Sequence, residues 1–202
     1  MFLSKKHKIL LIPNPRCATA SICKSLQMKP VKGWDVHRPF IEFRRAHFNT
    51  WENYTTMIVV RDPVQRFLSA CESTNTTPES MLPLLKNWKE CERRIPRIFQ
   101  PQSSFLCKID LVIGLPWVAE FFNHNLWPIL KKDNMLHAPG RPREVSDEMR
   151  EQIEEYYSAD MELLGGGSTA IPIWTPDESV PRFIWGDCSE CAAKFQRSND
   201  FA

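Results

Sequence analysis

The sequence predicts an α/β fold in which helices flank a central parallel sheet in three layers. Two short apolar segments, residues 8–12 and 56–60, are each followed by a proline-bearing loop and then by a segment with helical periodicity. A third apolar segment, residues 108–113, repeats this order. Such strand–loop–helix units favour a parallel sheet, because each helix carries the chain back across the sheet before the next strand begins.

Helical spacing of apolar residues, together with capping residues and prolines, sets the expected helices. We expect them over residues 19–26, 40–48, 63–71, 81–92, from 116 onward, and 146–164. Ser146 is the expected N-cap of the last of these, because a serine hydroxyl accepts a bond from a free N–H of the first turn. The Ser/Thr/Asn-rich residues 73–80 and the polar, proline-bearing residues 131–145 are expected to be surface loops.

A run of small residues, Gly165-Gly166-Gly167-Ser168, divides the chain. We expect an α/β domain over residues 1–164 and a C-terminal extension over residues 165–202, either wrapped on the domain or partly disordered.

Composition narrows the class of protein. The chain has 202 residues, of which 43% are hydrophobic, and a net charge of +2, so no global field indicates nucleic acid or a membrane surface as partner. The apolar run at residues 9–12 is too short for a signal peptide or a membrane span. The seven scattered cysteines, without such a signal, predict reduced thiols and a cytoplasmic protein. Cys188 and Cys191 form one isolated pair, which favours plain thiols over a zinc site or a redox pair.

The loop after the first strand has the chemistry of an anion site. Residues 13–22 lie between a buried strand and a helix, where free N–H groups and a partial positive charge attract anions. Thr19 and Ser21 add hydroxyl groups, and Arg16 adds a fixed charge. The loop contains no glycine, so it is not a Walker A loop. An ordinary strand-to-helix turn capped by a hydroxyl is the alternative.

A second such segment follows the strand at residues 56–60. Arg61 stands at the carboxyl end of that strand, and Ser69 is two helical turns further on, so both can face one anion. Asp62 and Arg66, four residues apart, can instead pair with each other on the helix.

Together the two segments resemble the nucleotide-binding loops of carbohydrate-type sulfotransferases, which use 3′-phosphoadenosine 5′-phosphosulfate (PAPS). The first segment is similar to that family's Pro-Lys-Thr-Ala-Ser-Thr-Ser-Ile loop, which holds the 5′-phosphosulfate. The second matches every fixed position of its 3′-phosphate motif, Arg-Asp-Pro-x-x-Arg-x-x-Ser. The resemblance implies a three-layer P-loop-like fold. It also implies a PAPS site made of Pro15, Arg16, Cys17, Ala18, Thr19, Ala20, Ser21, Arg61 and Ser69.

Weaker similarities extend the resemblance toward Leu164. Residues 101–103, Pro-Gln-Ser, are similar to a Pro-Gln segment before the family's third strand, and residues 146–164 are similar to its closing helix. These similarities concern the fold more than the chemistry.

The resemblance also assigns catalytic roles. Arg16 stands where the family has a lysine that touches the oxygen linking sulfate to phosphate; arginine keeps the charge but changes the shape of the donor group. His37 lies where the family commonly has a catalytic histidine before a helix, and a histidine suits proton transfer near neutral pH. His47 and Glu42 are the alternatives, as is a site without a base.

We therefore expect sulfuryl transfer from PAPS to an acceptor hydroxyl, without a metal ion. The family link favours a glycan or a similar small molecule as acceptor, and no nucleic acid or membrane span is expected. The first alternative is a non-catalytic nucleotide-binding or interaction protein on the same fold. The second is an ATP-dependent kinase, which the missing Gly-rich loop argues against.

Overall fold

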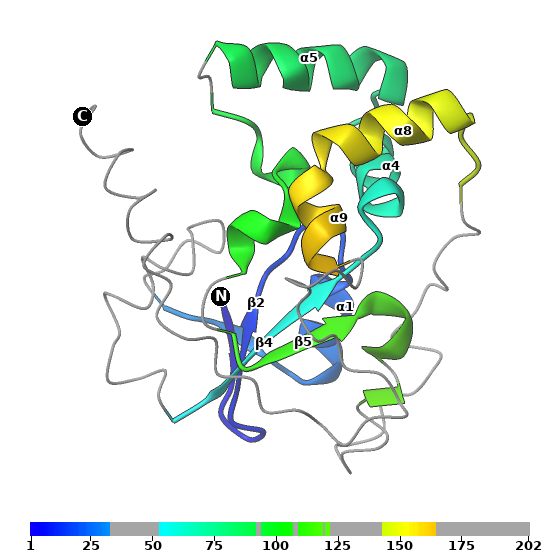
Figure 1. The fold of residues 1–202 in the computed structure, drawn as a ribbon. Helices are drawn as coiled ribbons and strands as arrows, with labels where there is room; N and C mark the ends of the chain where they lie inside the picture. The colour runs from blue at the N-terminus through cyan, green and yellow to red at the C-terminus, as the bar shows by residue number, and fades with distance from the viewer. Residues whose placement is uncertain (33–52, 92–93, 107–108, 119, 122–142, 165–202) are drawn as a thin grey trace.

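The computed structural model describes residues 1–32, 53–91, 94–106, 109–118, 120–121 and 143–164 (Figure 1). Within these residues the fold is mixed α/β, with five strands in the order β3-β1-β2-β4-β5. The strands are β1 (Phe2–Ser4), β2 (Ile9–Ile12), β3 (Lys29–Pro30), β4 (Thr55–Val60) and β5 (Leu111–Gly114). The α-helices are α1 (Thr19–Ser25), α4 (Pro63–Ser73), α5 (Pro78–Glu90), α8 (Asp147–Tyr156) and α9 (Ser158–Leu164). Short 3₁₀ turns span η1 (Arg97–Phe99), η2 (Gln102–Phe105) and η3 (Leu115–Trp117).

The centre of the sheet is parallel, as the sequence predicts. β4 pairs in parallel with β2 on one side and with β5 on the other. Every residue of β2 is buried, and only the first residue of β4 is exposed. Strands buried on both faces carry continuous apolar runs, which is the pattern that identified these two segments.

The prediction of a wholly parallel sheet is wrong at one edge. Residues 5–8 form a turn, with Lys8 at a positive φ of 55°, and this turn folds β1 back antiparallel to β2. β3 then pairs antiparallel with β1. A hairpin of this kind rests on backbone pairing between very short strands, and so it leaves little hydrophobic pattern in the sequence.

Both faces of the sheet are covered. One face packs against α1 and the start of the segment after η3; its buried core includes Ile22, Leu26, Val118 and Phe121. The other face packs against η2 and the end of α9, with Phe105 in its core. The alternating side chains of β2 and β4 contribute to both cores, as a two-sided sheet requires.

A separate apolar cluster joins α4, α5 and α8, which Figure 1 shows stacked beyond the end of the sheet from which β4 leads into α4. Phe67 of α4 lies at its centre, with its ring centroid 5.9 Å from that of Phe99 and 6.0 Å from that of Tyr157. This cluster fixes α4 against the rest of the molecule, and α4 carries the second predicted phosphate segment.

The single helix predicted over residues 146–164 is in fact two helices. Ser146 is the N-cap as expected, but α8 ends at Tyr156 with Tyr157 as its C-cap, and α9 runs in a new direction (Figure 1). The break lets the Tyr157 hydroxyl donate to the Phe99 carbonyl at 2.8 Å. It also lets Asp160 of α9 accept the backbone N–H bonds of Gln102 and Ser103, each at 2.8 Å. These tertiary bonds, rather than local propensity, decide where the helix divides.

Other boundaries shift by a few residues. The predicted loop 73–80 ends earlier, because Thr77 and Ser80 form a capping box that starts α5 at Pro78. The predicted strand 108–113 begins later, since the Asp110 carboxylate accepts bonds from the backbone N–H and hydroxyl of Thr56. The helix expected from residue 116 opens as η3.

Some predicted segments lie outside the described residues. They are the helix over residues 40–48, most of the loop over residues 131–145, and the extension over residues 165–202. Among the helices that the structure describes, none is long and apolar enough to cross a membrane.

The buried Asp160 yields the first prediction. The substitution Asp160→Ala removes the acceptor of two backbone N–H groups of η2. It should therefore lower the free energy of unfolding by about 3 kcal/mol. Urea unfolding followed by circular dichroism measures the change. The exposed Glu151→Ala on the neighbouring helix is the control, with an expected change within about 0.5 kcal/mol. Equal effects of the two substitutions would contradict this role of Asp160.

Candidate functional site

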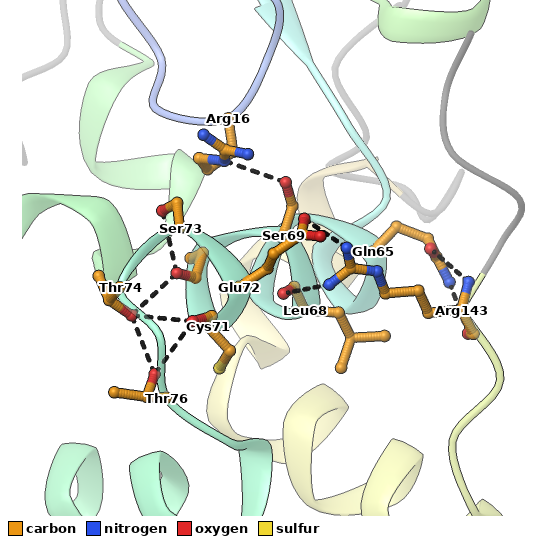
Figure 2. Close-up of polar contacts among 11 residues, drawn as sticks. Arg16, Gln65, Leu68, Ser69, Cys71, Glu72, Ser73, Thr74, Thr76 and Arg143 are labelled. Carbon is orange, nitrogen blue, oxygen red and sulfur yellow. Dashed lines mark hydrogen bonds and ion pairs between the residues drawn. The ribbon is translucent and has the colours of Figure 1, made fainter. Parts of the chain in front are cut away.

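The two predicted phosphate segments meet in the folded chain. Arg16, in the loop between β2 and α1, donates from Nε to the hydroxyl oxygen of Ser69 on α4 at 3.0 Å (Figure 2). Arg16 is exposed, whereas Ser69 is only 8% exposed. The carboxyl ends of the neighbouring parallel strands β2 and β4 lead into these two segments. This is the edge of an open α/β sheet at which ligands bind.

The loop after β2 has a strained backbone. Arg16 and Ala18 both have positive φ values, 65° and 57°, although neither is glycine. A side chain in this region typically costs about 1 kcal/mol or more. The turn is closed by bonds to the Asn14 carbonyl from the Cys17 N–H at 3.3 Å and from the Thr19 hydroxyl at 3.2 Å. The surrounding contacts therefore hold the loop in a shape that its own residues do not favour.

Arg66 provides one of those contacts. Its side chain is fully buried and donates from Nε to the Pro15 carbonyl at 3.1 Å and from Nη2 to the Ile98 carbonyl at 3.4 Å. The alternative in which Arg66 pairs with Asp62 is wrong: Asp62 instead caps α4 by accepting the Gln65 N–H. In the described part of the chain no carboxylate forms an ion pair with Arg66, and its Nη1 has no partner. The buried guanidinium of Arg66 thus holds the loop after β2 in place through the Pro15 carbonyl.

Gln102 sets the position of both strand ends. Its Oε1 accepts from Asn14 Nδ2 at 2.9 Å and from the Arg61 N–H at 3.0 Å, while its Nε2 donates to the Arg61 carbonyl at 2.7 Å. Asn14 also donates to the Val59 carbonyl at 2.9 Å. The sequence marked Gln102 only as part of a segment that concerns the fold, and it gave no reason to single out Asn14. Both residues act through tertiary bonds that no local pattern reveals.

Arg61 is the least compensated charge at the site. Its guanidinium is half-buried, and the structure gives it no hydrogen bond or ion pair with any described residue. Burial lowers the pKa of Arg61, and the charges of Arg16 and Arg143 lower it further, against the opposing influence of Cys17 and Asp62. Cations gathered in this way favour an anion between them.

Cys17 lies within the loop but is not a nucleophile. The thiol is buried and donates weakly to Gln102 Oε1 and to the Pro15 carbonyl, both at 3.6 Å. Burial raises its pKa to about 12, although the nearby arginines oppose this. Since the thiolate is the reactive form, Cys17 has a packing role.

The other residues predicted from the loop are placed as follows. Ala18 is the N-cap of α1 and makes no side-chain capping bond, and Thr19 begins the helix. Ala20 is exposed and Ser21 is half-buried. The candidate bases His37, His47 and Glu42 lie outside the described residues, as do Cys188 and Cys191. The described residues contain no cluster of metal-ligating side chains.

Comparison with known proteins gives no further information on this site. No protein-family model, curated protein or solved structure matches the chain. The resemblance to sulfotransferases therefore rests on the sequence motifs alone.

One charged residue at the site was missed by the sequence analysis. Arg143 lies in the segment before α8, yet its guanidinium lies against α4, where Nη1 donates to the Leu68 carbonyl at 3.0 Å and Nη2 forms an ion pair with Glu72 (Figure 2). Arg143 is separated from Leu68 by 75 positions in the sequence. It stands in a segment that the pattern marks only as a loop, so no sequence signal points to it.

The buried thiol of Cys17 leads to a prediction on reactivity. At pH 8, iodoacetamide should alkylate Cys17 in the folded protein at least about 100-fold more slowly than in urea, because few thiolates form and access is blocked. The exposed Cys91 should react at similar rates in both states. Peptide mass spectrometry over time measures both rates, and fast native labelling of Cys17 would contradict its burial.

The raised pKa values of three thiols predict how the free energy of unfolding depends on alkaline pH. Burial raises the pKa values of Cys17 and Cys23 to about 12 and that of Cys71 to about 11, from an ordinary value of 9.0. Between pH 9 and pH 12 the unfolded chain should therefore release protons that the folded chain retains. The free energy of unfolding should be insensitive to these groups below pH 9 and should fall above it. Urea midpoints from pH 8 to pH 10.5 test this, and Cys17→Ala should make the decline less steep.

Proposed function

We propose that this chain is a PAPS-dependent sulfotransferase with a three-layer P-loop-like fold. The bond between Arg16 and Ser69 carries the proposal. It joins two segments that resemble the 5′- and 3′-phosphate loops of one family, at the carboxyl ends of adjacent parallel strands. A chance likeness in either segment alone would give no reason for the two to meet.

In this proposal the 3′-phosphate binds to Arg61 and Ser69. The Arg61 guanidinium has donors to spare, since no described residue occupies them, and Ser69 accepts a bond from Arg16 but keeps its own O–H to donate. A guanidinium fork and a hydroxyl together suit a phosphate dianion. The nucleotide would replace the bond between Arg16 and Ser69 with bonds to its own oxygens.

The 5′-phosphosulfate would lie on residues 15–21. Arg16 carries an exposed guanidinium at the start of this stretch, and the buried guanidinium of Arg66 donates to the Pro15 carbonyl beside it. The loop has no glycine, but its positive φ values at Arg16 and Ala18 produce the tight turn that glycine usually provides.

The reaction would be an in-line displacement at sulfur. The acceptor hydroxyl oxygen forms a bond to sulfur while the bond from sulfur to the bridging phosphate oxygen breaks, and the electron pair remains on that oxygen. Arg16 would neutralise the charge that develops there, and His37 would take the acceptor's proton. Positioning and fixed charge provide most of the rate enhancement in this type of transfer, so the scheme needs no metal ion. The family likeness favours a glycan or a related small molecule as the acceptor.

Nucleotide binding gives the direct test. Arg61→Ala should weaken the binding of 3′,5′-bisphosphoadenosine about 100-fold and Ser69→Ala about tenfold, because each variant loses bonds to a dianion. The affinity for 5′-AMP should hardly change, and ATP should compete poorly. Isothermal titration calorimetry measures these constants, with the exposed Lys86→Ala as a control for general charge.

Turnover separates the enzyme from a binding protein on the same fold. Transfer of labelled sulfate from PAPS to a panel of glycans and small hydroxyl compounds should occur with the native chain and be lost in Arg61→Ala. Tight bisphosphate binding without transfer to any acceptor would favour the non-catalytic alternative. No bisphosphate binding at all would reject the proposal.

A further inference from the structure

The segment that carries Arg143 is clamped to α4 by its backbone. The Arg143 N–H donates to Gln65 Oε1 at 3.1 Å, and Gln65 Nε2 donates back to the Arg143 carbonyl at 3.2 Å. This pair of bonds holds the main chain of residue 143 beside the first turn of α4 and does not involve the Arg143 side chain. The base of the Arg143 side chain is therefore fixed close to the proposed phosphate site.

The guanidinium of Arg143 is partly exposed to solvent. It contacts the Leu68 carbonyl and the carboxylate of Glu72, on the same stretch of α4 that carries Ser69 (Figure 2). The side chains of Arg143 and Glu72 are 41% and 59% exposed, so solvent screens their ion pair. A short rotation of an exposed side chain can exchange one partner for another at small cost.

Glu72 is the only carboxylate paired with a cation of this site among the described residues. A hydrogen bond from Arg143 and the charge of Arg143 lower the pKa of Glu72, and the charges of Arg16 and Arg61 lower it further. The same carboxylate thus lies within the electrostatic influence of three arginines from three separate segments. It is therefore a negative charge, three residues after Ser69 on α4, that already interacts with the cations to which a bound anion would be attracted.

We propose that Glu72 is a built-in competitor of the ligand and that Arg143 is a third phosphate-binding residue. In the free protein Glu72 holds Arg143; when a phosphate dianion binds beside Arg61 and Ser69, Arg143 moves from Glu72 to the phosphate. This inference rests on the proposed function only in taking the anion to be the 3′-phosphate of the nucleotide. Glu72 then weakens phosphate binding both by retaining Arg143 and by repelling the dianion, which would speed release of the bisphosphate product.

The sign of the Glu72 effect makes the idea testable. Glu72→Gln removes a surface ion pair, yet it should bind 3′,5′-bisphosphoadenosine about fivefold to tenfold more tightly than the native chain. Arg143→Met should bind it about tenfold more weakly. In the double variant the gain from Glu72→Gln should shrink to about twofold, because Arg143 is no longer there to be released. Affinity for 5′-AMP should stay within about twofold throughout.

A matched control is available in the Lys86–Glu155 pair, an exposed ion pair between α5 and α8 with a separation of 3.4 Å. Lys86→Met removes one positive charge, as Arg143→Met does, and Glu155→Gln removes one negative charge, as Glu72→Gln does. Neither control should change the affinity for the bisphosphate or for 5′-AMP. Calorimetry gives the affinities, and thermal melting without ligand confirms that each variant is folded. If Glu72→Gln binds no tighter than Glu155→Gln, Arg143 and Glu72 form only a surface pair and the inference is wrong.

Inorganic phosphate separates this inference from the proposed function. If no variant binds the bisphosphate, the proposed function fails, and the thermal shift with phosphate then decides the inference. A larger shift in Glu72→Gln than in the native chain, lost in Arg143→Met, supports a phosphate site that serves another ligand. Equal phosphate shifts in all variants, or none in any, overturn the inference. Bisphosphate binding that depends on Arg61 but not on Arg143 or Glu72 overturns it while the proposed function stands.

Discussion

The side-chain amide of Gln102 is the contact on which the site depends. Its two polar atoms bind Asn14 after β2 and both backbone groups of Arg61 after β4. Its own backbone N–H is held by Asp160 of α9. Gln102, Asn14 and Asp160 are buried, where an unpaired polar atom is costly, and the network therefore tolerates little change in geometry. One amide thus sets the relative position of two strand ends and of the closing helix.

Positive charge is concentrated above this network, although the chain as a whole carries a net charge of only +2. Arg66 is buried, and no described carboxylate pairs with it. Arg61 is half-buried, and its guanidinium forms no hydrogen bond or ion pair with a described residue. Such an arrangement destabilises the free protein and stabilises any complex with an anion. The strained turn at Arg16 and Ala18 lies at the same place. Strain and unbalanced charge at one location are typical of a site shaped for a ligand rather than for stability.

The chemistry available there is electrostatic rather than covalent. The one thiol in the loop, Cys17, remains protonated, and the hydroxyl of Thr19 is already bonded to the Asn14 carbonyl. What remains is a set of guanidinium groups and the Ser69 hydroxyl, which can bind and neutralise an anion. The proposed transfer of a sulfuryl group relies mainly on those two actions. Its proton transfer is assigned to His37, which lies outside the described residues. As proposed, Glu72, on the same helix as Ser69, would limit how tightly that anion is held.

The sequence by itself determined the strands β2 and β4 and the helices that follow them, because continuous apolar runs, prolines and capping residues act locally. It also located the two segments that are proposed to bind phosphate. It left the pairing of Arg66 open, took α8 and α9 for one helix, and overlooked the antiparallel edge of the sheet. Only the tertiary structure decided these points and brought Arg143 to the site. The reason is physical: a buried guanidinium, a helix break and a salt bridge between distant segments depend on which carbonyls and carboxylates surround them, and those neighbours exist only once the chain has folded.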